Sequence, residues 1–243
     1  MPDLSHIAAI AFDLDGTLVD SAPDISHALN TALGSAGLRS FDLCTARAWI
    51  GDGPDVLIAR ALSEQGIATA SAELKSRLRR DFDVATLAAP LKYGTVYGGI
   101  AELIAGLRGV LPMVVITNKP TALARAVLEA AQLLRFMAGV HGADTAALRK
   151  PDPAMLLAAA ARWGLPASCV LMVGDGPADV QAADAAGCPC ALVAWGYGSD
   201  SVPAHLNPWR VETPKQLLHS LITQTPCRQR TFNDRGAHDA HRR

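Results

Sequence analysis

The stretch that decides the fold is IAAIAFDLDGTL, residues 7–18, in which six apolar residues run directly into two aspartates and a glycine. A short continuous apolar run is typical of a strand buried on both faces of a parallel sheet. Three further runs predict strands of the same kind, at residues 113–116, 170–173 and 190–194. The first run therefore indicates a sheet whose central strands end in reactive side chains.

Helical patterns separate most of these strands. Helices are predicted over residues 120–134, from Asp152-Pro153 to 163, over 179–186 and from Thr213-Pro214 to 221. Asp152-Pro153 offers an N-cap and a first-turn proline, and Gly187 offers a C-terminal stop. This alternation predicts the α/β class with a doubly wound parallel sheet.

The interval between the first two strands, from Asp20 to Pro112, is too long for a simple crossover connection. Apolar residues recur in it at helical spacing, as at Ala28, Leu29, Ala32, Leu33 and Ala36, at Val56, Ala59, Arg60 and Ser63, and at Leu74, Leu78 and Phe82. We expect residues 20–90 to form a small inserted helical cap on a core made of residues 1–19 and 91–225. Residues 226–243 lose apolar periodicity and are expected to form a disordered tail.

Composition narrows the classes of partner. Half of the 243 residues are hydrophobic, 19% are charged and the formal net charge is −1. A globular protein without an electrostatic footprint for nucleic acid or for a membrane surface is therefore expected, acting on a small metabolite as a monomer or homodimer. Five cysteines without a CxxC pair predict neither a zinc site nor a disulfide framework. With no recognisable signal peptide or membrane span, a cytoplasmic location is expected.

Polar side chains follow three of the predicted strands: Asp13 and Asp15 the first, Thr117 and Asn118 the second, and Asp175 the third. The carboxyl ends of parallel strands converge on one crevice, so these residues are expected to be neighbours. Asp13, Asp15 and Asp175, with Asp179 close behind, would repel one another without a cation. All-oxygen ligands without a nearby histidine suit Mg²⁺ better than zinc, so the predicted cofactor is Mg²⁺.

Four motifs resemble those of the haloacid dehalogenase superfamily. DLDGTLVDS at residues 13–21 resembles the first motif, VITN at 115–118 the second, KPDP at 150–153 the third, and Gly174-Asp175 followed by Asp179 the fourth. Their order and spacing make the resemblance specific across nearly the whole chain. It implies a Mg²⁺-dependent phosphomonoesterase that forms an aspartyl-phosphate.

The resemblance also implies residue roles. Asp13 would be the nucleophile and Asp15 the acid and base, with Thr117 and Lys150 as the other catalytic residues. The metal would be held by the carboxylates of Asp13 and Asp175 and by the backbone carbonyl of Asp15, with Asp179 supporting it from the next shell. Electrostatic repulsion between a dianionic ester and a bare carboxylate costs roughly 4 kcal/mol per unit charge pair at about 4 Å. Mg²⁺ and Lys150 would offset this repulsion.

A finer resemblance points to the bacterial phosphoglycolate phosphatase family. It lies in APDI (22–25), in WIGDG (49–53) followed by RAL (60–62), and in AGCP (186–189) followed by GYG (196–198). The implied reaction converts 2-phosphoglycolate to glycolate and phosphate, with Asn118 and the cap loop of Gly51, Asp52 and Gly53 near the substrate. From its position alone, Arg47 is expected to meet the glycolate carboxylate bidentately.

Two alternatives stay open beside this interpretation. One is a phosphatase or mutase for a sugar or amino-sugar phosphate, because fold and motifs do not define specificity. The other is a phospho-aspartate signalling receiver, against which Asp15 and the expected cap both argue. The sequence also departs from the fourth motif, since Gly176-Pro177-Ala178 stands where Ser and Arg-Asn are usual.

Overall fold

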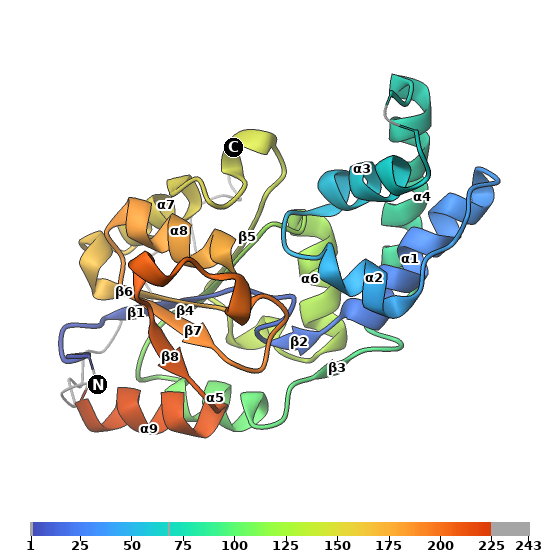
Figure 1. The fold of residues 1–243 in the computed structure, drawn as a ribbon. Helices are drawn as coiled ribbons and strands as arrows, with labels where there is room; N and C mark the ends of the chain where they lie inside the picture. Colours follow the sequence, from blue (N-terminus) through green and yellow to red (C-terminus); the bar gives the residue numbers. More distant parts are fainter. Residues whose placement is uncertain (1, 68, 225–243) are drawn as a thin grey trace, which may run out of the picture.

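Six parallel strands form the central sheet in the described part of the chain, residues 2–67 and 69–224 of a computed structural model (Figure 1). Their order is β5 (Gly139–Gly142), β4 (Met113–Thr117), β1 (Ala9–Phe12), β6 (Val170–Gly174), β7 (Cys190–Val193) and β8 (Trp209–Val211). The four strands predicted from apolar runs are confirmed as β1, β4, β6 and β7. The two edge strands, β5 and β8, were not predicted. The doubly wound α/β fold is confirmed.

Helices cover both faces of this sheet. On one face lie α5 (Ile100–Leu107), α6 (Thr121–Ala130) and α9 (Pro214–Gln224), and on the other lie α7 (Ala154–Arg162) and α8 (Pro177–Ala186) (Figure 1). Successive strand residues point to opposite faces, so Ile10 and Phe12 pack on the first face while Ala9 and Ala11 pack on the second. Both faces of β1 are therefore buried, which explains its uninterrupted apolar sequence.

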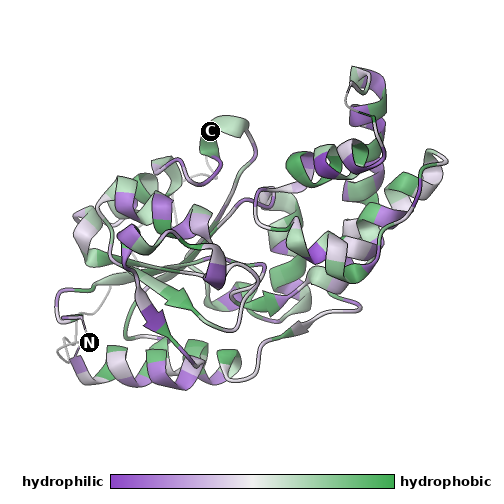
Figure 2. Ribbon diagram, in the orientation of Figure 1, coloured by the Kyte–Doolittle hydropathy of each residue, from purple (hydrophilic) through white to green (hydrophobic). Residues whose placement is uncertain are grey.

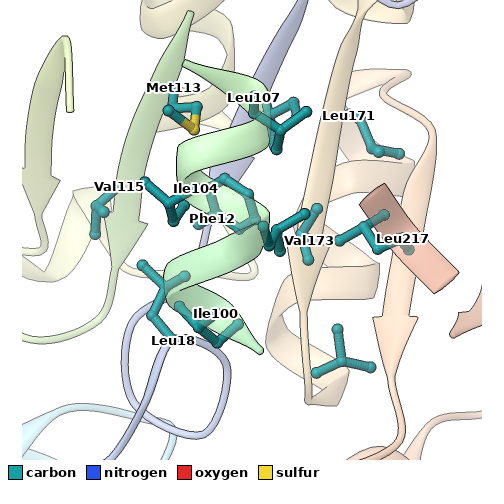
Figure 3. Packing of buried hydrophobic residues seen from close by; sticks show 14 of the residues in the cluster. Phe12, Leu18, Ile100, Ile104, Leu107, Met113, Val115, Leu171, Val173 and Leu217 are labelled. Atoms are coloured by element: carbon teal, nitrogen blue, oxygen red, sulfur yellow. The ribbon is translucent and has the colours of Figure 1, made fainter. Parts of the chain in front are cut away.

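Helix α5 shows how the first face is filled. Figure 3 shows Ile100, Ile104 and Leu107, one helical turn apart, packing toward the sheet around Phe12, and all four side chains are almost fully buried. Each such side chain contributes about 1.5–3 kcal/mol when it is removed from water. This packing anchors β1 immediately before Asp13.

A second group of helices is inserted between β1 and β4. We call α1 (Ala22–Ser35), α2 (Leu43–Ala48), α3 (Pro54–Glu64) and α4 (Ala72–Ala88) the helical unit. Its hydrophobic cluster also includes Leu123 of α6, and Figure 2 shows hydrophobic and hydrophilic residues alternating along its helices. A short antiparallel pair, β2 (Val19–Asp20) and β3 (Thr95–Val96), lies where the chain enters and leaves this unit. That residues 20–90 act as a separate cap domain stays a prediction.

Details of the predicted helices differ from the structure. The expected face of α3, at Val56, Ala59, Arg60 and Ser63, is wrong, because α3 buries the more uniformly apolar face of Leu57, Ile58, Ala61 and Leu62. Helix α6 ends at Ala130 rather than at residue 134, since Gln132 takes a left-handed conformation with φ 59°. The buried face of α1 is confirmed at Ala28, Leu29, Ala32 and Leu33.

Two further expectations concern the ends of the chain and membranes. The tail at residues 226–243, with Cys227, lies outside the described residues. In the part of the chain that the structure describes, none of the helices combines the length and the hydropathy needed to cross a bilayer.

Candidate active site

The site lies at the carboxyl ends of the three central strands. Asp13 directly follows β1, Thr117 ends β4 and Asp175 directly follows β6. Because β4 and β6 flank β1 on opposite sides, the chain changes its winding direction there, and such a switch point opens a crevice in α/β sheets. The expected convergence of these residues is confirmed.

A tight turn after β1 aims two carboxylates into one pocket. Gly16 has φ 88° and its amide donates to the Val19 carbonyl at 2.9 Å. A side chain at Gly16 would collide with the Asp175 carboxylate, so glycine is required for both conformation and space. Asp13 and Asp15 line the same pocket as a result.

Three buried carboxylates form a candidate metal centre. Ligand oxygens of Asp13, Asp175 and Asp179 all lie within 4.8 Å of one another. Burial raises the pKa of Asp13 to about 7 although Lys150 opposes the shift, and burial together with Asp179 raises the pKa of Asp175 to about 6. The protein alone thus compensates these negative charges incompletely, and an all-oxygen set of this kind fits a hard divalent cation.

Lys150 lies between two of these carboxylates. Its Nζ donates to Asp13 Oδ1 at 2.7 Å, to Asp179 Oδ1 at 2.6 Å and to the Ile116 carbonyl at 2.9 Å. Burial favours the neutral amine, yet the two carboxylates hold the pKa of Lys150 above its usual value. Lys150 is therefore a buried ammonium group placed directly against Asp13.

Asp179 and Thr17 orient the acidic cluster. Asp179 Oδ2 accepts from the amides of Asp175 at 3.2 Å and Gly176 at 3.1 Å at the start of α8. Pro177 is the first residue of that helix, where its missing N–H costs nothing, so the unusual fourth-motif sequence keeps a capped helix start. Thr17 Oγ1 donates to Asp175 Oδ1 at 3.1 Å.

Asp15 belongs to a different part of the site. Lys119 Nζ donates to both of its oxygens, at 2.7 and 2.6 Å, and Ser21 Oγ donates to Oδ1. Thr117 is buried beside this pair, and its Oγ1 accepts from the Lys119 amide at 3.2 Å, which leaves its hydroxyl proton free to donate toward the pocket. The Asp15 side chain lies outside the group formed by Asp13, Asp175 and Asp179.

The Gly51–Gly53 loop of the helical unit reaches over the crevice. Asn118 Nδ2 donates to the carbonyls of Gly51 at 2.9 Å and Lys150 at 3.0 Å. Gly53 has φ 83°, and a Cβ there would lie 2.8 Å from the Asn118 carbonyl oxygen. Gly51 and Gly53 both line the pocket, so the structure brings this loop to the carboxylates, as expected.

The pocket beneath this loop is polar at one end and apolar at the other. Its cavity volume is about 40 Å³, well below the range of about 300–1,000 Å³ typical of small-molecule sites. Its polar end consists of Asp13, Asp15, Thr117, Asn118 and Lys119, and its apolar end consists of Ile25, Ile50, Pro54, Leu57, Phe82 and Leu123. A small ligand with one highly polar end fits this division.

The sequence matches known proteins over most of its length. Residues 7–187 match the family described as haloacid dehalogenase-like hydrolase. The chain is a haloacid dehalogenase-like hydrolase.

Individual relatives refine this membership. The hydrolase is 38% identical over 218 residues to a protein of Pseudomonas syringae pv. tomato named phosphoglycolate phosphatase, which covers 89% of this chain and 78% of the relative. It is 40% identical over 200 residues to a protein of the same name from Rhodospirillum rubrum, covering 80% and 82% of the two chains. A crystal structure described as a predicted phosphoglycolate phosphatase from Haemophilus somnus 129pt superposes with a TM-score of 0.82 at 29% identity, over 90% of this chain and 99% of that one.

These matches confirm the resemblance found in the motifs. The hydrolase is an enzyme of the phosphoric monoester hydrolase type, similar to the bacterial phosphoglycolate phosphatases. They also speak against the signalling receiver, because the matched family is one of hydrolases.

Two candidate substrate-binding residues of the hydrolase have other partners. Arg47 pairs with Asp20 at 3.5 Å, and its guanidinium lies 4.7 Å from the centre of the Tyr197 ring, outside the residues that line the pocket. Asp52 pairs with Arg60 and likewise does not line the pocket. The structure does not bring either residue to the carboxylates, and a role of either in substrate binding stays a prediction.

Sequence reasoning missed Lys119 and Ser21, the two partners of Asp15. A signal for Lys119 was available, because it stands two residues after Thr117, the spacing that also separates Asp13 from Asp15. Ser21 belongs to the quoted first motif, yet nothing in the local pattern showed that its hydroxyl turns back to Asp15.

Proposed function

We propose that this hydrolase is a Mg²⁺-dependent phosphatase that hydrolyses 2-phosphoglycolate through an aspartyl-phosphate on Asp13. The observation that carries the proposal is the position of Asp13, which lines the pocket while its carboxylate contacts the Lys150 ammonium at 2.7 Å. One cation thus holds a buried carboxylate that lines this pocket.

The metal would be held by the carboxylates around Asp13. The oxygens of Asp13, Asp175 and Asp179 are close enough to share one cation, and the raised pKa values of Asp13 and Asp175 indicate unmet negative charge. This set favours Asp179 as a direct ligand candidate beside the expected role of the Asp15 carbonyl. When bound, Mg²⁺ supplies charge neutralisation for the phosphoryl group and for the nucleophile.

The first half-reaction uses Asp13, Lys150 and Thr117. A carboxylate oxygen of Asp13 forms a bond to phosphorus while the bond from phosphorus to the ester oxygen breaks. Lys150 keeps the pKa-raised carboxylate ionised and oriented for this attack. The Thr117 hydroxyl, on the pocket side, is placed to donate to a phosphoryl oxygen.

Asp15 moves the protons in both half-reactions. It first gives a proton to the departing alkoxide and then accepts one from the water that attacks the phosphoaspartate, which releases phosphate and restores Asp13. Its position beside Asp13 in the same pocket supports this double role.

The pocket supports a short leaving group. The relatives described above carry the name phosphoglycolate phosphatase, and the residues beyond the acidic end are apolar. The hydroxyl groups of a sugar would be buried there without hydrogen-bond partners, at a cost of about 1–3 kcal/mol each. Glycolate is shorter and brings one carboxylate in place of several hydroxyl groups, so it requires one cationic partner rather than many hydrogen-bond partners, which favours glycolate over a sugar or amino sugar.

A phosphate-release screen tests the proposal. The purified enzyme is assayed with Mg²⁺ on 2-phosphoglycolate, hexose phosphates, amino-sugar phosphates and pyrophosphate, with product analysis to detect a mutase. We expect 2-phosphoglycolate to have the highest kcat/KM. If a sugar phosphate is preferred, the substrate assignment is wrong while the phosphatase class stands.

Trapping the intermediate tests the nucleophile. Asp13→Asn should lose phosphate release, whereas the exposed Asp184→Asn control should retain it. Asp15→Asn should accumulate one phosphoryl group, visible by intact mass, when mixed with substrate and Mg²⁺. Turnover by Asp13→Asn at the wild-type rate would exclude Asp13 as the nucleophile.

A further inference from the structure

Lys119 is the cation of the pocket. Among the described residues that line it, Lys119 alone has a basic side chain, while Lys150 contacts Asp13 from outside the lining. The Lys119 side chain is only 6% exposed, and two of its three N–H donors go to the Asp15 oxygens at 2.7 and 2.6 Å. Its third donor is the one left to meet a ligand.

An acidic leaving group needs such a cation. The carboxylate of a glycolate group would enter a pocket that already contains Asp13 and Asp15, and like charges repel one another strongly in a partly buried site. The rest of the lining beyond these groups is mainly apolar. Arg47, the residue expected to meet this carboxylate, is engaged with Asp20 and Tyr197.

We propose that Lys119 binds the carboxylate of the leaving group and releases the Asp15 side chain as it does so. The inference rests on the proposed hydrolysis of 2-phosphoglycolate and names the residue that selects this substrate. In the free enzyme Lys119 and Ser21 together occupy both oxygens of Asp15. Transfer of Lys119 to the substrate leaves Asp15 Oδ2 open to the ester oxygen.

Because of this exchange, the carboxylate of the substrate frees the Asp15 side chain that then protonates its leaving group. A substrate without a carboxylate leaves Lys119 on Asp15, so its ester oxygen has to compete with the ion pair. Selectivity for the acid should therefore appear in kcat as well as in KM. A residue that only positioned Asp15 would affect both kinds of substrate equally.

The test compares two substrates on each enzyme preparation: 2-phosphoglycolate and 2-hydroxyethyl phosphate, in which CH2OH replaces the carboxylate. The ratio of their kcat/KM values does not depend on the fraction of folded enzyme. Wild type should prefer 2-phosphoglycolate. Lys119→Met should lower kcat/KM for 2-phosphoglycolate by about 30-fold or more, as expected for loss of a buried charged pair. Because the variant also removes the ion pair with which the ester oxygen of 2-hydroxyethyl phosphate competes, kcat/KM for that substrate should rise.

Two further variants serve as controls. Lys119→Arg keeps the charge and should retain most of the ratio, whereas Lys75→Met removes an exposed lysine of α4 and should leave the ratio unchanged. Inhibition by glycolate gives a readout without turnover, and it should weaken in Lys119→Met alone.

Three outcomes would overturn the proposal. If Lys119→Met lowers kcat/KM by the same factor for both substrates, Lys119 only positions Asp15. If Arg47→Met removes the preference while Lys119→Met retains it, Arg47 binds the carboxylate. If wild type shows no preference for 2-phosphoglycolate, the proposed function fails and this inference fails with it, a result seen before any variant is made.

Discussion

The side chain of Asn118 brackets the backbone of Lys150, accepting from its amide at 2.7 Å and donating to its carbonyl at 3.0 Å. The same Nδ2 also donates to the Gly51 carbonyl at 2.9 Å. One amide group therefore joins the strand end at β4, the lysine that contacts Asp13, and the loop above the pocket.

Asn118→Asp tests this junction with almost no change of shape. The new oxygen would face two carbonyl oxygens where the amide donated before, so the free energy of unfolding should fall by about 1–3 kcal/mol. Because Lys150 would shift, kcat should fall about tenfold or more, measured per folded enzyme.

Asn30→Asp is the matched control. Asn30 brackets the Phe41 backbone in the same way, at 2.8 and 2.9 Å, within the helical unit. We expect a similar loss of stability in chemical denaturation with kcat retained. Equal loss of kcat in both variants would show that Asn118 affects turnover only through stability.

Gly53→Ala should disturb the loop over the pocket. The new Cβ would lie 2.8 Å from the Asn118 carbonyl oxygen at a φ of 83°. We expect a loss of about 1–2 kcal/mol in stability and a clear rise in KM. Gly66→Ala, at φ 77° with open space around it, should show the stability loss with normal KM. Normal KM in Gly53→Ala would argue against contact between this loop and the substrate.

Removal of metal should make stability depend on pH. Burial raises the pKa of Asp13 from 3.8 to about 7 and that of Asp175 to about 6, so the folded chain binds protons more tightly than the unfolded chain does. In EDTA, stability is thus greatest near pH 4 and declines as the pH rises to about 7, by on the order of 1–3 kcal/mol.

Thermal unfolding between pH 4 and pH 8 measures this decline. Mg²⁺ should restore Tm at pH 7.5, and Asp13→Asn should show a smaller decline and a smaller response to Mg²⁺. The exposed Asp184→Asn should behave as wild type. Stability in EDTA that rises over this range would contradict the assigned pKa directions.

Tyr197→Phe should loosen the junction between the helical unit and the sheet. The Tyr197 hydroxyl donates to Asp20 Oδ1 at 2.8 Å and accepts from the Ala22 amide at 3.1 Å. Loss of this hydroxyl should lower the free energy of unfolding by about 1 kcal/mol and speed hydrogen exchange at the start of α1. The Tyr197 amide still donates to Asp175 at 2.7 Å, so kcat should change little. The exposed Tyr93→Phe is the control, and unaltered exchange in Tyr197→Phe would exclude a bracing role for this hydroxyl.

Local pattern was enough for the centre of the fold and for much of the site. Strands β1, β4, β6 and β7 were predictable because each is buried on both faces and reads as an apolar run. The edge strands were not, since β5 is the glycine-rich GVHG and β8 has three residues, and neither carries an apolar run. The buried face of α3 was not predicted correctly either, because the orientation of this helix depends on the helices packed against it.

The sequence by itself determined which reactive residues follow the central strands, because the end of a strand and the turn after it depend on residues adjacent in the chain. Only the tertiary structure decided which cation meets which carboxylate. Lys150 lies on Asp13 and Asp179, Lys119 on Asp15, and Arg47 on Asp20 rather than in the pocket. These ion pairs form between segments that lie far apart in the chain and meet only through packing. Lys119 and Asp15 are 104 residues apart, so no local sequence pattern could predict their contact.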